Sequence, residues 1–247
     1  MLDDNCNGAV DEGGICGSHC YTGPARILVY APGGTRGTTL MAPGTAVTTV
    51  ATEAMWSAMT TADFGNYDII WLDGVGTCSG TADAIYGTAQ DTIATWGPAV
   101  RGRIELLIGD PDYHGGTPAQ LFYTNSANWL KTNGRNVDGG RTSLFINWGC
   151  TVFGSNAAGM PPGSRGYPER FTAVLGAPIT TDVTNFCAAT TSAAGAGHPV
   201  LVGLPPYWSC PLHGGFVTYP AGYTVITYGA GASGPGIIVR DTSPCTP

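Results

Sequence analysis

Short, uninterrupted apolar segments alternate with longer segments of helical periodicity from about residue 25 onward, and this alternation limits the fold more than any other feature. Each apolar segment is only a few residues long and is followed by Gly or Pro, as in buried strands. We expect strands at 26–30, 67–72, 103–108 and 143–148. Further strand signals lie at 200–204, 216–219, 223–227 and 236–239.

The intervening segments predict helices at 45–59, 81–96, 118–130 and 167–175. In the second of these, apolar residues at 85, 89, 93 and 96 share one helical face, and Gly97-Pro98 ends the helix. Near-continuous apolar strands that alternate with helices are typical of a parallel sheet covered on both faces. The sequence therefore predicts an α/β fold with an open, mostly parallel sheet and helices on both faces.

Residues 1–24 differ from the rest in being polar and rich in Cys and Gly, so we divide the chain into this segment and an α/β domain over 25–247. Within it, oxygen-bearing side chains recur at alternate positions and a Gly follows, which is the opening pattern of an EF-hand-type calcium loop. Calcium prefers six to eight oxygen ligands. We expect one Ca²⁺ to be held by the side chains of Asp3, Asn5, Asn7, Asp11 and Glu12 and the carbonyl of Ala9.

Residues 4–13 (Asp-Asn-Cys-Asn-Gly-Ala-Val-Asp-Glu-Gly) resemble the metal-binding motif of secreted bacterial proteins, which is akin to thrombospondin type 3 and dockerin loops. The resemblance covers residues 3–16 and implies calcium binding outside the cell or at its surface. Gly14 stands where an EF-hand loop carries a bidentate Glu, and Cys6 interrupts the loop. The alternative is a disulfide-pinned turn with a solvated acidic face.

The cysteine content and the charge limit the compartment and the partners. Eight cysteines, an even number, predict disulfides and an oxidising compartment, although their pairing stays open. Residues 1–20 contain no signal-peptide pattern, so we expect the native protein to be longer. A net charge of −7 with one lysine, Lys131, argues against nucleic acid and anionic membranes as partners. No apolar run is long enough for a membrane span.

Three segments, 26–34, 67–76 and 197–204, resemble the core of the class I glutamine amidotransferase-like superfamily, in its ThuA-like or noncatalytic branches. The resemblance covers residues 25–240 and implies a flavodoxin-like domain. In that family the nucleophile follows the strand after the one matched by 67–72. Here Gly109-Asp110-Pro111 stands there, so the resemblance implies a domain that lacks the nucleophile. Cys78 fits the G-x-C-x-G pattern but lies one strand too early, and a disulfide is the favoured role for it.

Asp110, Asp112 and His114 come directly after the strand at 103–108, where open parallel sheets place their ligand crevice. These side chains could bind a metal or form an acid–base set. The alternative is an ordinary Asp-Pro turn with a helix cap. Likewise, Gly33–Gly37 could cradle an anion, but a tight turn is the favoured account. For His198 and His213 a structural role is favoured.

Three functions remain open from the sequence. The leading expectation is a secreted, noncatalytic surface, adhesion or self-assembling protein, including a filament, because charge is low and small residues are abundant. The second is a secreted hydrolase of glycans or esters that uses Asp110, Asp112 and His114. The third is a carbohydrate-binding module, for which surface glycans would be partners. Its candidate stacking residues are the aromatics in polar loops, Trp148, Phe153, Tyr207 and Trp208.

Overall fold

A computed structural model describes residues 23–74, 81–114, 116–131, 142–149, 163–182, 188–209, 212–229 and 234–242, without the side chains of His114 and Ser209. The calcium motif at residues 3–12 and all eight cysteines lie outside these ranges. Calcium binding and disulfide formation therefore stay predictions.

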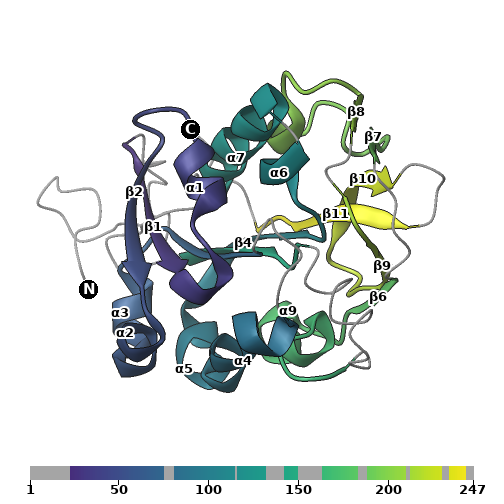
Figure 1. Cartoon of the computed structure of the whole chain (residues 1–247). Helices are drawn as coiled ribbons and strands as arrows, with labels where there is room; N and C mark the ends of the chain where they lie inside the picture. The colour runs from purple at the N-terminus through teal and green to yellow at the C-terminus, as the bar shows by residue number, and fades with distance from the viewer. Residues whose placement is uncertain are drawn as a thin grey trace, which may run out of the picture.

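The described residues form an open sheet of nine strands with the order β2-β1-β3-β5-β4-β11-β10-β7-β8 (Figure 1). Five adjacent strands are mutually parallel: β2 (Ala46–Ala51), β1 (Ala25–Tyr30), β3 (Ile69–Asp73), β5 (Thr142–Asn147) and β4 (Val100–Leu107). Four antiparallel strands extend the sheet beyond β4: β11 (Pro235–Arg240), β10 (Thr224–Gly229), β7 (Ala188–Thr191) and β8 (Tyr207–Ser209). A separate two-stranded sheet pairs β6 (Thr180–Asp182) with β9 (Gly215–Thr218).

Helices cover both faces of the sheet, which confirms the predicted α/β class. One face carries α2 (Glu53–Ala58), α3 (Thr61–Gly65), α4 (Ala82–Asp91), α5 (Ile93–Trp96) and α9 (Thr172–Leu175). The other carries α1 (Arg36–Leu40), α6 (Pro111–His114) and α7 (Gly116–Lys131). Alternate residues of β1 pack on opposite faces: Leu28 joins the core under α2 to α5, and Val29 joins the core under α7.

Two predicted elements are wrong. The expected helix at 45–59 is the edge strand β2 followed by the short helix α2. Its first half is rich in β-branched residues, which favour strands, and it pairs in parallel with β1. Thr52 then starts α2, because its side chain accepts a hydrogen bond of 3.2 Å from the Met55 amide.

The expected strand at 200–204 is instead the 3-10 helix η4 (Pro199–Leu201). The proline favours the first helical position, because it has no amide hydrogen to satisfy. His198 precedes it, and its Nδ1 accepts a 3.3 Å hydrogen bond from the Val200 amide. The imidazole therefore fixes a turn, which agrees with the structural role favoured for it.

The strand order reverses at one point of the sheet, and this reversal predicts where a ligand crevice lies. β1 is followed by β2 on one side and has β3 on its other side. In open α/β sheets, ligands bind where the strand order reverses in this way, beyond the carboxyl ends of the strands. The loop after β1 and the carboxyl ends of β3, β4 and β5 therefore bound the region to examine for function.

Candidate acid–base site

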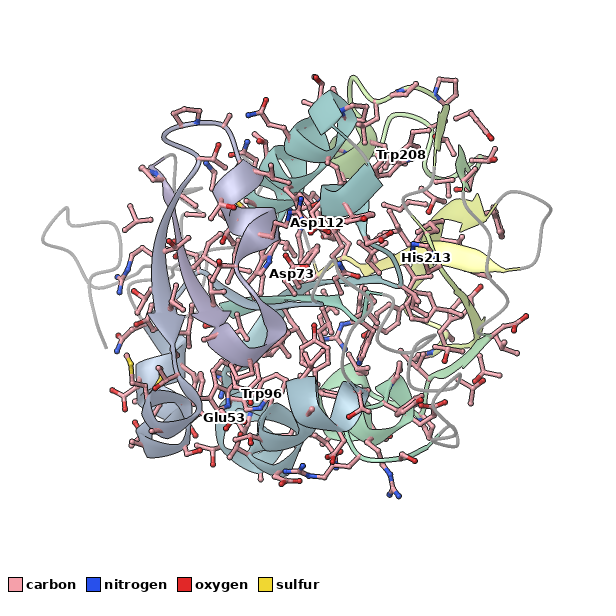
Figure 2. The ribbon with its side chains drawn as sticks, in the orientation of Figure 1. Glu53, Asp73, Trp96, Asp112, Trp208 and His213 are labelled. Atoms are coloured by element: carbon pink, nitrogen blue, oxygen red, sulfur yellow. The ribbon has the colours of Figure 1, made fainter. Side chains whose placement is uncertain are left out.

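Polar side chains gather at the carboxyl ends of the three central parallel strands. Asp73 is the last residue of β3, Asn147 is the last of β5, and Asp110 and Asp112 follow β4. All four are buried. Figure 2 shows Asp73 and Asp112 on the face of the sheet that α1, α6 and α7 cover. Buried polar groups carry a desolvation cost, so this concentration of carboxyl groups needs specific compensation.

The loop after β1 folds over the carboxylate of Asp73. The Gly37 amide donates a 3.0 Å hydrogen bond to Oδ2 of Asp73. A Cβ at Gly37 would collide with that same oxygen and with the Tyr123 ring, so only glycine allows the approach. The Gly33–Gly37 loop thus directs the amide of Gly37 to a carboxylate of the protein itself, which agrees with its interpretation as a tight turn.

The pKa of Asp73 is strongly raised. Burial and then the negative charge of Asp112 raise the pKa of Asp73 from 3.8 to about 7. Hydrogen bonds from Asn147 and Gly37 act in the opposite direction, because they stabilise the ionised form. Asp73 is therefore poised to exchange a proton near neutral pH.

Asn147 connects the ends of all three central strands. Its Nδ2 donates a 3.0 Å hydrogen bond to Oδ1 of Asp73, at the end of β3. Its Oδ1 accepts hydrogen bonds from the amides of Gly149, at 2.8 Å, and Gly109, at 3.2 Å. Its backbone carbonyl accepts a 2.6 Å hydrogen bond from the Tyr86 hydroxyl. Asn147 therefore fixes Asp73 relative to the turn that carries Asp110.

A histidine from a distant part of the chain completes the cluster. Nε2 of His213 lies 2.6 Å from Oδ1 of Asp110, and both side chains are largely buried. The amide of His213 donates a 3.0 Å hydrogen bond to the carbonyl of Ile108, which attaches this segment to the end of β4. Gly214 packs closely against Ile108 as well, at a point where a Cβ would come within 2.9 Å of its side chain.

Asp112 is the member of the cluster closest to an exposed cation. Nε of Arg36 lies 3.5 Å from Oδ2 of Asp112, and the Arg36 side chain is 53% exposed while that of Asp112 is 1% exposed. Within the described part of the chain, neither oxygen of Asp112 makes a hydrogen bond. Burial raises the pKa of Asp112, and the positive charge of Arg36 partly offsets this rise. Asp112 can therefore hold a proton at a higher pH than an ordinary aspartic acid.

Comparisons with known proteins do not assign a family. No model of a known protein family matches the chain, and a search of curated proteins gives no match. Among solved structures, the chain is similar to a putative GMP synthase component from Thermoplasma acidophilum, with 10% identity and a TM-score of 0.41. The alignment covers 85% of this chain and 75% of that one. A similarity of this size carries no argument about function, so the amidotransferase resemblance stays a prediction.

The structure brings together only part of the acid–base set expected from the sequence. Asp110 and Asp112 lie in the cluster, and the histidine that contacts Asp110 is His213. His114 is the last residue of α6, but its side chain lies outside the description. The turn after β4 carries Gly109 and Asp110, with neither Cys nor Ser, as the sequence indicates.

The sequence favoured a structural role for His213, and it did not single out Asp73 or Asn147. His213 lies about a hundred residues from Asp110 in a Pro-containing segment, with no spacing pattern to connect the two. Asp73 directly follows the predicted strand at 67–72, and Asn147 lies next to the end of the predicted strand at 143–148, so a polar residue at a strand end was the available signal. No group of three or more His, Cys, Asp or Glu side chains suited to a metal ion occurs among the described residues.

The loop aromatics prove to be mostly core residues. Trp148 is buried and its Nε1 donates a 3.2 Å hydrogen bond to the carbonyl of Gly166. Trp208 is buried with its ring 5.5 Å from that of Phe122. Tyr207 is 59% exposed, and Phe153 lies outside the described ranges. Trp148 and Trp208 therefore cannot form an exposed stacking surface. No described helix is long and apolar enough to cross a membrane.

Proposed function

We propose that this protein is a hydrolase of glycosides or esters that uses Asp110, Asp112 and His213 as an acid–base set. The observation that carries the proposal is the 2.6 Å approach of His213 Nε2 to Asp110 Oδ1, two residues from the buried Asp112. These groups lie where open α/β sheets bind ligands. Burial raises the pKa of Asp112, and a titratable group with a shifted pKa at such a position is typical of catalytic sites.

In this mechanism, the Asp110 carboxylate orients the His213 imidazole through the 2.6 Å contact. The imidazole accepts a proton from a water molecule, and the water oxygen forms a bond to the electrophilic carbon of the substrate. The bond from that carbon to the leaving oxygen breaks. Protonated Asp112 donates its proton to the leaving oxygen. Solvent then returns the proton from His213 to Asp112, so that one water is consumed in each turnover.

Asp73 and Asn147 act indirectly, by influencing Asp112 and the turn after β4 rather than by contacting the substrate. Asp73 is fully enclosed, with both oxygens in hydrogen bonds, so it does not contact substrate in this account. A negative charge on Asp73 favours protonation of Asp112, since like charges in a buried site disfavour double ionisation. Asn147 holds Asp73 and the Gly109 amide in fixed relation. Both are therefore positioning residues.

The test is a panel of chromogenic glycosides and esters with the wild type and two variants. Asp112→Asn removes the proposed acid with little change of shape. Asp83→Asn is the matched control, because Asp83 is an exposed residue of α4 on the opposite face of the sheet. We expect the wild type to hydrolyse at least one of these substrates. Asp112→Asn should lower this turnover by about a hundredfold or more, and Asp83→Asn should leave it unchanged. A panel without turnover by the wild type, or turnover that Asp112→Asn does not change, contradicts the proposal.

A second candidate function is self-association, which the edge strand β2 favours. β2 ends the sheet, carries no charged residue, and exposes 61% of Val47 and 44% of Val50. Uncharged edge strands with exposed β-branched residues invite pairing with another strand, here that of a second copy. Sedimentation of the wild type should show oligomers that Val47→Lys disrupts. Val217→Lys is the control, since Val217 is 60% exposed on β9. A wild type that sediments as a monomer at all concentrations contradicts this candidate.

The proposal also places the protein outside the cell and assigns Ca²⁺ to residues 3–12. Both statements rest on the sequence motif and on the eight cysteines.

A further inference from the structure

We infer that Arg36, Tyr113 and Asp112 form a binding site for a sugar ring, so that glycans rather than simple esters are the ligands of the strand-end cluster. We call these three residues the rim site. The assignment of a reaction to this ligand rests on the proposed function, whereas the binding itself does not.

The first observation is an exposed aromatic ring beside a buried carboxyl group. Tyr113 directly follows Asp112 in α6 and is 58% exposed. The guanidinium carbon of Arg36 lies 5.9 Å from the centre of the Tyr113 ring. An exposed tyrosine ring offers a flat apolar surface with a polar tip, which suits the C–H face of a sugar.

The second observation concerns Asp112. Its side chain is 1% exposed, yet neither oxygen makes a hydrogen bond among the described residues. The Tyr123 hydroxyl lies close enough to lower the pKa of Asp112. The carboxyl group of Asp112 is therefore poorly satisfied despite the nearby Tyr123 hydroxyl, and such buried groups are rare in proteins. A hydroxyl group of a sugar supplies a donor for the oxygen of Asp112 that carries no proton.

The third observation is the half-exposed guanidinium of Arg36, which covers Asp112. Its Nε lies 3.5 Å from Oδ2 of Asp112, a distance too long for a good hydrogen bond, so the contact holds Arg36 only weakly. α1 has five residues and Arg36 is the first of them, so rotation of this side chain can break its contact with Oδ2 of Asp112 without unfolding a helix. The displaced guanidinium can then donate to oxygens of the ligand.

These requirements together select a polyol ring. The ligand must donate a hydrogen bond to Asp112, accept hydrogen bonds from Arg36, and present an apolar face to Tyr113. A sugar ring meets all three requirements, while a simple alkyl ester has no donor for Asp112. An anionic ligand would meet Arg36 but would also approach the carboxyl groups of Asp112, Asp110 and Asp73, which disfavours it.

The test is an equilibrium binding measurement that needs no turnover. An array of immobilised neutral oligosaccharides is probed with wild type, and the Kd of each bound glycan is then measured by calorimetry. Tyr113→Ala removes the ring. Tyr207→Ala is the matched control, because Tyr207 is 59% exposed and Tyr113 is 58% exposed. Circular dichroism of each variant checks that the fold is retained.

We expect Tyr113→Ala to weaken binding by about tenfold or more, and Tyr113→Phe and Tyr207→Ala to change the Kd by less than about twofold. An array that binds no wild-type protein, or binding that Tyr207→Ala weakens as much as Tyr113→Ala, overturns the inference.

Failure of the rim site and failure of the proposed function give different results. Glycan binding that depends on Tyr113, together with a hydrolase panel without turnover, supports the rim site and contradicts the hydrolase. Turnover of esters that depends on Asp112, with no glycan bound, overturns the rim site and supports the hydrolase.

Discussion

Several acidic side chains in this protein lie where water cannot solvate them, and their protonation is therefore linked to folding. Asp73 belongs to the strand-end cluster, whereas Glu105 lies in the middle of β4. Glu105 is fully buried, and its Oε1 accepts a 2.8 Å hydrogen bond from Ser126 of α7. Its other oxygen makes no hydrogen bond among the described residues. Burial of this kind favours the neutral acid.

Glu105→Gln should flatten the pH dependence of stability. Burial raises the pKa of Glu105 from 4.5 to about 8, so the folded protein keeps a proton that the unfolded chain releases between these values. The free energy of unfolding therefore falls as pH rises through this window, by at most about 1.4 kcal/mol per pH unit for this group. Gln keeps the acceptor for Ser126 and does not ionise.

Urea unfolding of the wild type and Glu105→Gln at several pH values from about 5 to 8 measures this effect. We expect the wild type to lose stability with rising pH more steeply than the variant. Some slope remains in the variant, because Asp73 also has a raised pKa. Equal slopes for the two proteins would show that Glu105 does not titrate in this window.

At the scale of elements, the short helix α1 packs against the carboxyl end of β3, where the strand order predicts a ligand crevice. Gly37 of α1 contacts Asp73 through its amide and leaves no room for a side chain. This close approach holds the loop after β1 against the end of β3. The position of α1, and with it that of Arg36, therefore depends on the absence of a Cβ at one residue.

Gly37→Ala should destabilise the protein by about 1–3 kcal/mol, because the added methyl group overlaps Oδ2 of Asp73 and the ring of Tyr123. Gly65→Ala is the matched control, since Gly65 also lies in a five-residue helix but has nothing within 4 Å of an added Cβ. Thermal unfolding of both variants compares them. Similar melting temperatures for Gly37→Ala and the wild type would mean that α1 does not pack on Asp73 as described.

The burial and pairing of each strand explain which elements could be predicted from the sequence. The strands at 26–30, 67–72, 103–108 and 143–148 are confirmed, because each carries a run of apolar residues that the fold buries on both faces of the sheet. β2 was missed because the spacing of its apolar residues also fits a helix, and pairing with β1 decides its state. In the site, Asp110 and Asp112 follow from the strand-end rule. His213 does not, because tertiary packing near β9 brings it to Ile108.

At the scale of the whole molecule, the chain carries 17 acidic and 10 basic residues, and the calcium motif at its start contains several of the acidic ones. If residues 3–12 bind Ca²⁺, bound metal stabilises the folded state by mass action. Thermal unfolding with Ca²⁺ should give a higher midpoint than unfolding with a chelator, and Asp3→Ala should reduce this difference. Identical curves under both conditions would exclude a calcium site that is coupled to folding.

The central claim is that the strand-end carboxyl groups form one coupled acid–base site. The direct measurement is a pH titration of the carboxyl carbon of Asp73 by NMR, in the wild type, Asp112→Asn and Asp83→Asn. We expect Asp73 to titrate near pH 7 in the wild type. Its pKa should fall in Asp112→Asn, which removes a neighbouring negative charge, and stay unchanged in Asp83→Asn. An Asp73 that titrates near 3.8 in all three proteins would contradict the account.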